Sequence, residues 1–280
     1  MKKAKSRPLY RLRRDRRAAS PAISTAIITS AVVVMLLVTV SFANNYLNAR
    51  LAENEFSAMK QYMQTVGLQI DDVAWIPGRT QTVRYASRNG QAQFQSLALN
   101  YSFYFDGATV ANYSVKVGVV LFNMPISAYQ IGNNYYERIS PSTNSLLQTN
   151  ASAPVCRVFV IEKVPMADGN YIRVVAAPLV RQLNAVINTT NYVRFYLPIL
   201  ETGPNPRYSQ SVTLSGKNIN HQIANGITNV TITVGFPNNG IGLGQDFFNF
   251  DRLSETVTVA SSTVVEIYAG NVTVSMGLYA

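Results

Sequence analysis

The strongest constraint on the fold is an apolar stretch near the N-terminus. Residues 21–43 read PAISTAIITSAVVVMLLVTVSFA, and no charged residue lies between Arg17 and Arg50. As a helix these residues extend about 34 Å, which exceeds the ~30 Å hydrocarbon core of a membrane. The six Ser and Thr hydroxyls of the stretch can bond to carbonyls one turn earlier. A soluble fold would need a large core around this helix, so the stretch predicts a transmembrane helix.

Most of the charge of the chain lies in front of this stretch. Residues 1–17 hold nine basic residues and one acidic residue, which gives +8 of the net charge of +10. The high isoelectric point therefore belongs to a tail, and we expect no nucleic acid as a partner. Basic residues beside a membrane-spanning helix favour the cytoplasmic side. We therefore expect a single-pass cell-membrane protein with a cytoplasmic N-terminus and its remaining residues outside.

Three fates are open for this N-terminus. A secretory signal peptidase could cut after Ser41-Phe42-Ala43, although the apolar stretch is longer than the 7–15 residues usual for such signals. The segment could instead stay uncut as an anchor. In the third case a protease cuts on the cytoplasmic side, between the basic tail and the apolar stretch.

The third case has a sequence pattern that supports it. The run RRAASPAI at residues 16–23 resembles the processing site of archaeal type IV pilins, a class III signal peptide. In that family a basic and then a small residue precede the cut, and Ser-Pro-apolar-Ile opens the mature helix. The resemblance implies that Arg17 and Ala18 precede the cut and that Ala19 begins the mature chain. It covers about thirty residues. Bacterial pilins carry Glu where this chain has Ile23, so the archaeal subgroup fits better.

The resemblance also implies partners and an assembly. The partners are the membrane, a prepilin peptidase and the pilus assembly machinery, an ATPase and a polytopic platform protein. Subunits of such filaments self-associate through their N-terminal helices. Small side chains allow helices to approach closely, and this chain offers four in the first turns of the apolar stretch, Ala22, Ala26, Ser30 and Ala31.

The helix is expected to extend well beyond the membrane. Ser20 is a good N-cap and Pro21 suits the first helical position, so we expect the helix to begin there. It should fray near Asp71-Asp72, which oppose the helix dipole, and Pro77-Gly78 should stop it. This gives a leader at residues 1–18, a transmembrane helix at 19–43 and an amphipathic extension at 44–76.

The amphipathic extension carries an apolar stripe with alternating spacings of four and three. Its members are Ala52, Phe56, Met59, Met63, Val66, Ile70 and Val73. Such heptad spacing buries one helix face against a partner. The partner is either the chain's own outer domain or neighbouring helices in a filament core. The two uses are compatible, and the stripe alone favours the outer domain.

From residue 77 to residue 280 the residue pattern is that of β-strands. Runs rich in Tyr, Val, Thr and Ile are separated by turn residues, and no helices alternate with them. We predict an antiparallel, β-sandwich-like head, which with the helix makes an α+β fold. Residues 178–187 form a short helix or an irregular edge, and Gly270-Asn271 is a hairpin turn. The loop at 123–154 either lies on one domain or divides the head into two subdomains.

Nothing in the head predicts an enzyme, a cofactor or a metal site. One cysteine and one histidine exclude multi-Cys and two-His metal motifs. We expect Cys156 to be a buried small apolar residue and His221 to lie at the surface. The glycines at 240, 242 and 244 lack a phosphate-loop fingerprint and should form a loop. Asp246 and Asp251 lack the spacing of a calcium loop.

Six Asn-x-Ser/Thr sequons make glycosylation of an exported head possible, at Asn100, Asn112, Asn150, Asn188, Asn229 and Asn271.

The sequence as a whole leaves two functions from different classes. The first is a pilin-like, archaeal-type subunit of a surface filament, either the major component or a minor pilin. The alternative is a single-pass anchor for an extracellular binding or adhesion domain that does not polymerise.

Overall fold

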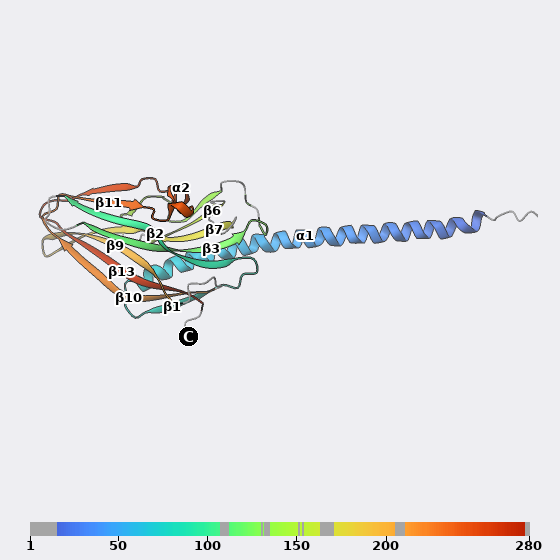
Figure 1. Ribbon diagram of the computed structural model, residues 1–280, viewed down its shortest axis with the longest axis horizontal. Helices are drawn as coiled ribbons and strands as arrows, with labels where there is room; N and C mark the ends of the chain where they lie inside the picture. The colour runs from blue at the N-terminus through green and yellow to red at the C-terminus, as the bar shows by residue number, and fades with distance from the viewer. Residues whose placement is uncertain are drawn as a thin grey trace, which may run out of the picture. The chain divides into compact units, whose positions relative to one another are not determined.

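The computed structural model describes residues 16–106, 112–129, 131, 135–150, 152, 154–162, 171–204 and 211–277, with side chains from Pro21 onward except that of Glu162. The chain divides into two units, Met1–Leu51 and Ala52–Ala280. A single helix, α1 (Arg16–Ala74), contributes residues to both. The predicted order is confirmed at this level, because a long apolar N-terminal helix precedes a large β-rich domain (Figure 1).

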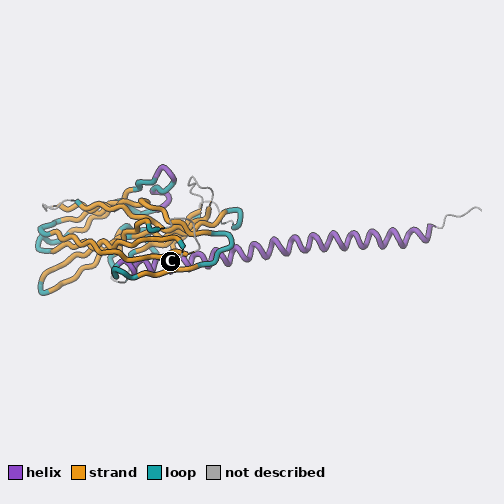
Figure 2. Tube along the Cα trace, turned by 60° about the horizontal axis from the view of Figure 1, so that its bottom comes forward, coloured by secondary structure: helices purple, strands orange, loops and turns teal. Residues whose placement is uncertain are grey.

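The strands of the second unit form two sheets, which occupy most of its described residues (Figure 2). The six-stranded sheet has the order β1 (Thr80–Arg84), β10 (Ser211–Ala224), β13 (Val264–Met276), β9 (Thr190–Thr202), β8 (Val180–Ile187), β5 (Leu147–Gln148). The seven-stranded sheet has the order β12 (Ser254–Thr258), β11 (Asn229–Gly235), β2 (Gln91–Asp106), β3 (Tyr113–Pro125), β7 (Tyr171–Pro178), β6 (Cys156–Glu162), β4 (Tyr136–Ser140). A short 3-10 turn, η1 (Asn239–Ile241), and α2 (Gln245–Phe248) precede β12.

The sheets are rich in antiparallel pairs but are not purely antiparallel as predicted. β9 and β13 run parallel from the pair Tyr192–Val264 to the pair Thr202–Val274. β5 and β8 also pair in parallel. Three strands lie between β9 and β13 in the sequence, so no hairpin turn sets their relative direction. Local sequence patterns carry no signal for such a pairing.

One hydrophobic core joins both sheets and the second half of α1. The rings of Phe103 on β2 and Phe195 on β9 lie 5.8 Å apart and connect the two sheets. Tyr62 on α1 packs edge-on against Phe122 on β3 at 5.6 Å. Residues 52–280 form one compact unit, so the division near 123–154 is not found. That stretch instead supplies the end of β3 and the strands β4 and β5.

Residues 178–187 are not a helix or an irregular edge, because β8 occupies Val180–Ile187 and pairs with β9. The two strands are joined by Asn188 and Thr189, with φ of 47° and 69°. Positive φ at both central residues is the geometry of a type I′ hairpin turn. The prediction failed because Thr189 is not a usual turn residue there.

Gly270-Asn271 is not a hairpin turn either, since β13 continues through both residues and pairs with β9 and β10. Gly270 instead allows the helix and the sheet to approach each other closely. A Cβ built on Gly270 would lie 2.3 Å from the carbonyl oxygen of Ala74, and one on Gly216 would lie 2.6 Å from that of Val73. The last turn of α1 therefore rests directly on the backbone of β10 and β13, where only glycine fits.

The C-terminal end of α1 also differs from the prediction. The helix continues past Asp71-Asp72 to Ala74. Asp72 forms an ion pair with Arg79 at 2.5 Å, and Asp71 accepts a hydrogen bond of 2.9 Å from the indole of Trp75. Arg181 on β8 lies 3.7 Å from the second oxygen of Asp71. These partners offset the unfavourable position of both carboxylates relative to the helix dipole.

Candidate membrane and assembly segment

The first unit presents an exposed α1 segment, defined here as residues 21–51. Every side chain of this segment is exposed, including Leu37 at 65% and Phe42 at 71%. One helix near the N-terminus is thus long and apolar enough to span a membrane. Bare apolar side chains in water are unfavourable by roughly 25 cal/mol per Å². The segment therefore requires lipid or protein around it.

Four of the six Ser and Thr hydroxyls of residues 21–43 donate to carbonyls of the same helix. Thr25 donates to the Ala22 carbonyl at 3.0 Å and Thr29 donates to the Thr25 carbonyl at 2.8 Å. Ser30 and Thr39 bond back in the same way, at 2.9 and 2.7 Å. In a membrane every polar group needs such an internal partner. These residues therefore do not oppose insertion into lipid.

The small residues Ala22, Ala26, Ser30 and Ala31 are all exposed along α1. Ala22, Ala26 and Ser30 follow one another at intervals of four residues, so they share one face of the helix. That face has no bulky side chain at these three positions. Another helix could approach its backbone closely there.

The predicted processing site lies at the start of α1. Arg17, Ala18 and Ala19 belong to its first turn, although their side chains are outside the described part of the chain, as are residues 1–15 altogether. The helix start predicted at Ser20 and Pro21 is not found, because the described residues from Arg16 to Ser20 are already helical. Pro21 consequently lies inside the helix and not at its first position.

Beyond Leu51 the same helix becomes part of the core of the second unit. The seven residues of the stripe, termed the buried stripe below, are all buried: Ala52, Phe56, Met59, Met63, Val66, Ile70 and Val73 range from 0 to 6% exposed. Gly67 lets the helix approach β6, where a Cβ would lie 3.0 Å from Val158. The spacing that defines the stripe in the sequence therefore selects the buried face of the helix.

A carboxylate on α1 holds the connection between β1 and β2. Glu55 accepts hydrogen bonds from the Ser87 hydroxyl, from the backbone N–H of Arg88 at 2.7 Å and from Asn89. Tyr85 donates to the backbone carbonyl of Glu55 at 3.2 Å. Partial burial disfavours the charged carboxylate, but the hydrogen bonds from Asn89, Ser87 and Arg88 outweigh it and lower the pKa of Glu55.

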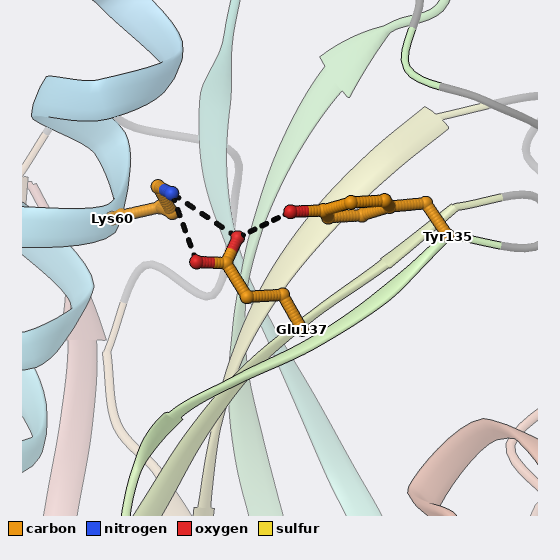
Figure 3. A network of polar contacts seen from close by, with 3 residues as sticks. All are labelled: Lys60, Tyr135 and Glu137. Carbon is orange, nitrogen blue, oxygen red and sulfur yellow. Dashed lines mark hydrogen bonds and ion pairs between the residues drawn. The ribbon is translucent and has the colours of Figure 1, made fainter.

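A second polar contact joins α1 to β4 (Figure 3). The Lys60 ammonium donates to both carboxylate oxygens of Glu137 at 3.1 Å. Tyr135 donates its hydroxyl to the same carboxylate at 2.8 Å. Partial burial, together with the bond to Glu137, raises the pKa of Tyr135 to about 12. Neither this contact nor the one at Glu55 was anticipated, because the partners lie more than thirty residues apart in the sequence.

The remaining candidates from the sequence, Cys156, His221 and the glycine run, take part in packing or in turns of the head. Cys156 is a free, buried cysteine, and burial raises the pKa of its thiol. His221 stacks on Tyr268 at 4.5 Å, with its Nε2 3.6 Å from Glu266. The glycine run forms η1 and the turn that leads into α2. Among the residues with described positions, no group of three His, Cys, Asp or Glu side chains could hold a metal.

Comparison with known proteins adds no relative. No protein family, curated protein or solved structure matches this chain. The exposed α1 segment and its continuation into the core are therefore the features on which a functional interpretation rests.

Proposed function

We propose that the chain is a type IV pilin-like subunit of a surface filament, of the archaeal kind. The precursor is anchored in the cell membrane by α1, with its N-terminus in the cytoplasm and the β-sandwich-like head outside. A prepilin peptidase then removes residues 1–18, and the assembly machinery adds the subunit to a filament. The observation that carries this proposal is that one helix has a first half whose side chains are all exposed and a second half with one fully buried face.

The length of the exposed half supports self-association. Residues 21–51 extend about 46 Å as a helix, whereas the hydrocarbon core of a membrane is ~30 Å thick. Lipid therefore covers only part of this surface. Leu47 and Leu51 lie beyond the transmembrane part of this segment and are more than half exposed. Packing against the same segment of neighbouring subunits covers them, and the open helical arrangement of such contacts gives a filament.

The position of Pro21 supports the cut after Ala18. In a helix that begins at Arg16, the carbonyl of Arg17 would accept its bond from the backbone nitrogen of residue 21. Proline has no N–H, so this bond is missing. The turn that holds Arg17 and Ala18 thus lacks one backbone hydrogen bond, which makes it easier for a peptidase to unwind.

The mature N-terminus tests the proposal. Mass spectrometry of protein taken from the cell surface should find Ala19 as the first residue. The double substitution Arg17→Glu, Ala18→Leu should leave the precursor uncut and unassembled. Arg14→Glu, a charge reversal away from the cut, should be trimmed normally. An intact Met1 on surface protein, or normal trimming of the double variant, would refute the proposal in favour of a non-polymerising anchored binding protein.

A further inference from the structure

The six sequons differ sharply in their surroundings. Asn112, Asn150 and Asn188 are exposed, whereas Asn100, Asn229 and Asn271 are only partly exposed. N-glycosylation attaches a bulky, hydrated sugar to the side-chain nitrogen of asparagine, and so it requires an accessible carboxamide at the surface. The structure therefore separates the six positions, which the sequence alone leaves equivalent.

The three partly exposed asparagines are built into strands. Asn271 lies in the middle of β13 between β9 and β10, and its side-chain oxygen is enclosed. The side-chain oxygen of Asn229 accepts a bond of 3.0 Å from Thr258 on the neighbouring strand. Asn100 accepts one of 3.1 Å from Ser114. A glycan at any of these positions would displace contacts between strands.

Asn188 has the opposite surroundings. It lies at the tip of the hairpin between β8 and β9, and both turn residues, Asn188 and Thr189, are exposed. No hydrogen bond is described for the Asn188 side chain. The threonine of its sequon, Thr190, pairs with Ile187 at the first position of β9.

The same hairpin tip exposes apolar surface. Val186 is 71% exposed and Ile187 is 41% exposed, directly before Asn188 in the sequence. Val186 is the most exposed of the large apolar side chains described in the second unit. Packing in the core does not explain why these two apolar side chains are here. A covering group attached next to them would explain it.

We infer that Asn188 is an N-glycosylation site and that its glycan covers Val186 and Ile187. This rests on the proposed function, because it requires the head to lie outside the cell. The donor is an oligosaccharide linked to a lipid phosphate. The Nδ2 nitrogen of Asn188 forms the new bond to the anomeric carbon and loses one proton. The bond from that carbon to the phosphate oxygen breaks, and the lipid phosphate leaves with the electron pair.

Asn112 and Asn150 are weaker acceptors on the same criteria. The Asn150 side-chain oxygen accepts the backbone N–H of Ser152 at 3.0 Å, so the carboxamide is already engaged in a local turn. Asn112 is followed by Tyr113, the first residue of β3, which packs against the core.

Peptide mapping of protein recovered from the surface of the producing cells tests the site. The peptide that contains Asn188 should carry the mass of a glycan. Asn188→Gln and Thr190→Ala should each remove that mass, whereas Thr190→Ser should keep it because serine preserves the sequon. Asn271→Gln should leave the glycan mass of the protein unchanged. An unmodified Asn188 in protein whose head is accessible to external protease would overturn the inference.

Binding of a hydrophobic fluorescent dye tests the covering role. Asn188→Gln should raise dye fluorescence above that of the glycosylated protein, and adding Val186→Thr and Ile187→Thr should remove the increase. Equal fluorescence with and without the glycan would overturn this part.

The N-terminus of the same preparation keeps the two proposals apart. An Ala19 start with bare Asn188 rejects the glycan alone. A Met1 start with modified Asn188 rejects the filament and retains the glycan.

Discussion

Two hydrogen bonds join Glu55 to Asn89, one from the Asn89 backbone N–H at 2.9 Å and one from its side-chain Nδ2 at 2.7 Å. They join α1 to the connection between β1 and β2, because Asn89 lies 34 residues after Glu55 in the sequence. Because the acceptor is an ionised carboxylate, these bonds are stronger than bonds between neutral groups. The stability of this part of the head should therefore depend on the charge of one side chain.

We expect Glu55→Gln to destabilise the head by about 1–3 kcal/mol, since it weakens bonds to a charged acceptor. The pKa of Glu55 is lowered in the folded state. Its contribution is thus complete above the ordinary value of 4.5 and is lost as the pH falls through the lower folded value. Thermal unfolding between pH 7 and 3 should show a larger loss for the wild type than for Glu55→Gln. Glu201→Gln, in a more exposed ion pair with Lys217, is the control and should change little. Parallel pH curves for wild type and Glu55→Gln would contradict this.

Ile70→Ala should destabilise the head by about 2–5 kcal/mol, because it leaves a cavity at a fully buried position of the buried stripe. Leu68→Ala is the matched control on the same turn of α1, since Leu68 is 66% exposed. It should shift the midpoint of denaturant unfolding only slightly. Equal shifts for the two variants would show that the stripe does not define the packed face.

Gly270→Ala should destabilise the head by about 1–3 kcal/mol, as overpacking does. The added methyl group would meet the backbone of Ala74, which cannot rotate away. Gly240→Ala is the control, because no atom lies within 4 Å of its added methyl group. Thermal unfolding measures both. A Gly270→Ala variant as stable as the wild type would mean that α1 does not rest on β13.

Pro21→Ala should slow removal of the leader. Alanine restores the N–H that bonds to the Arg17 carbonyl and is about 3 kcal/mol more favourable than proline inside a helix. The peptidase must then unwind a more stable turn. The rate of trimming, followed by gel mobility after a pulse of synthesis, measures the effect. Ala22→Ser changes a neighbouring residue without altering the backbone bonds and should be trimmed at the normal rate. Faster trimming of Pro21→Ala would contradict the explanation.

Cys156 should resist thiol reagents in the folded protein. It is 2% exposed, and burial raises the pKa of its thiol, so little reactive thiolate forms. Labelling at pH 8 should be slow in buffer and complete in denaturant, with the increase following the unfolding transition. Rapid labelling of the native protein would show that the region around β6 opens easily.

The parts of the fold that local spacing determines were predicted. The members of the buried stripe follow one another at three and four residues, and the long helix and the β-rich domain follow from composition and period. Contacts that depend on distant residues were not predicted. The bonds from Glu55 to residues 87–89 and the parallel pairing of β9 with β13 leave no local pattern. The hairpin turn predicted at Gly270 was wrong for a different reason. A glycine that is needed for close packing of two elements looks the same in the sequence as a glycine in a turn.

The way in which the second half of α1 is held has a mechanical consequence. The buried stripe runs along residues 52–73, and Glu55, Lys60 and Asp72 each bind a different part of the head. A tensile force applied along the helix axis would load these attachments in shear, so that they must yield together and not one after another. A head attached in this way withstands a larger tensile force than any one of these contacts could withstand alone.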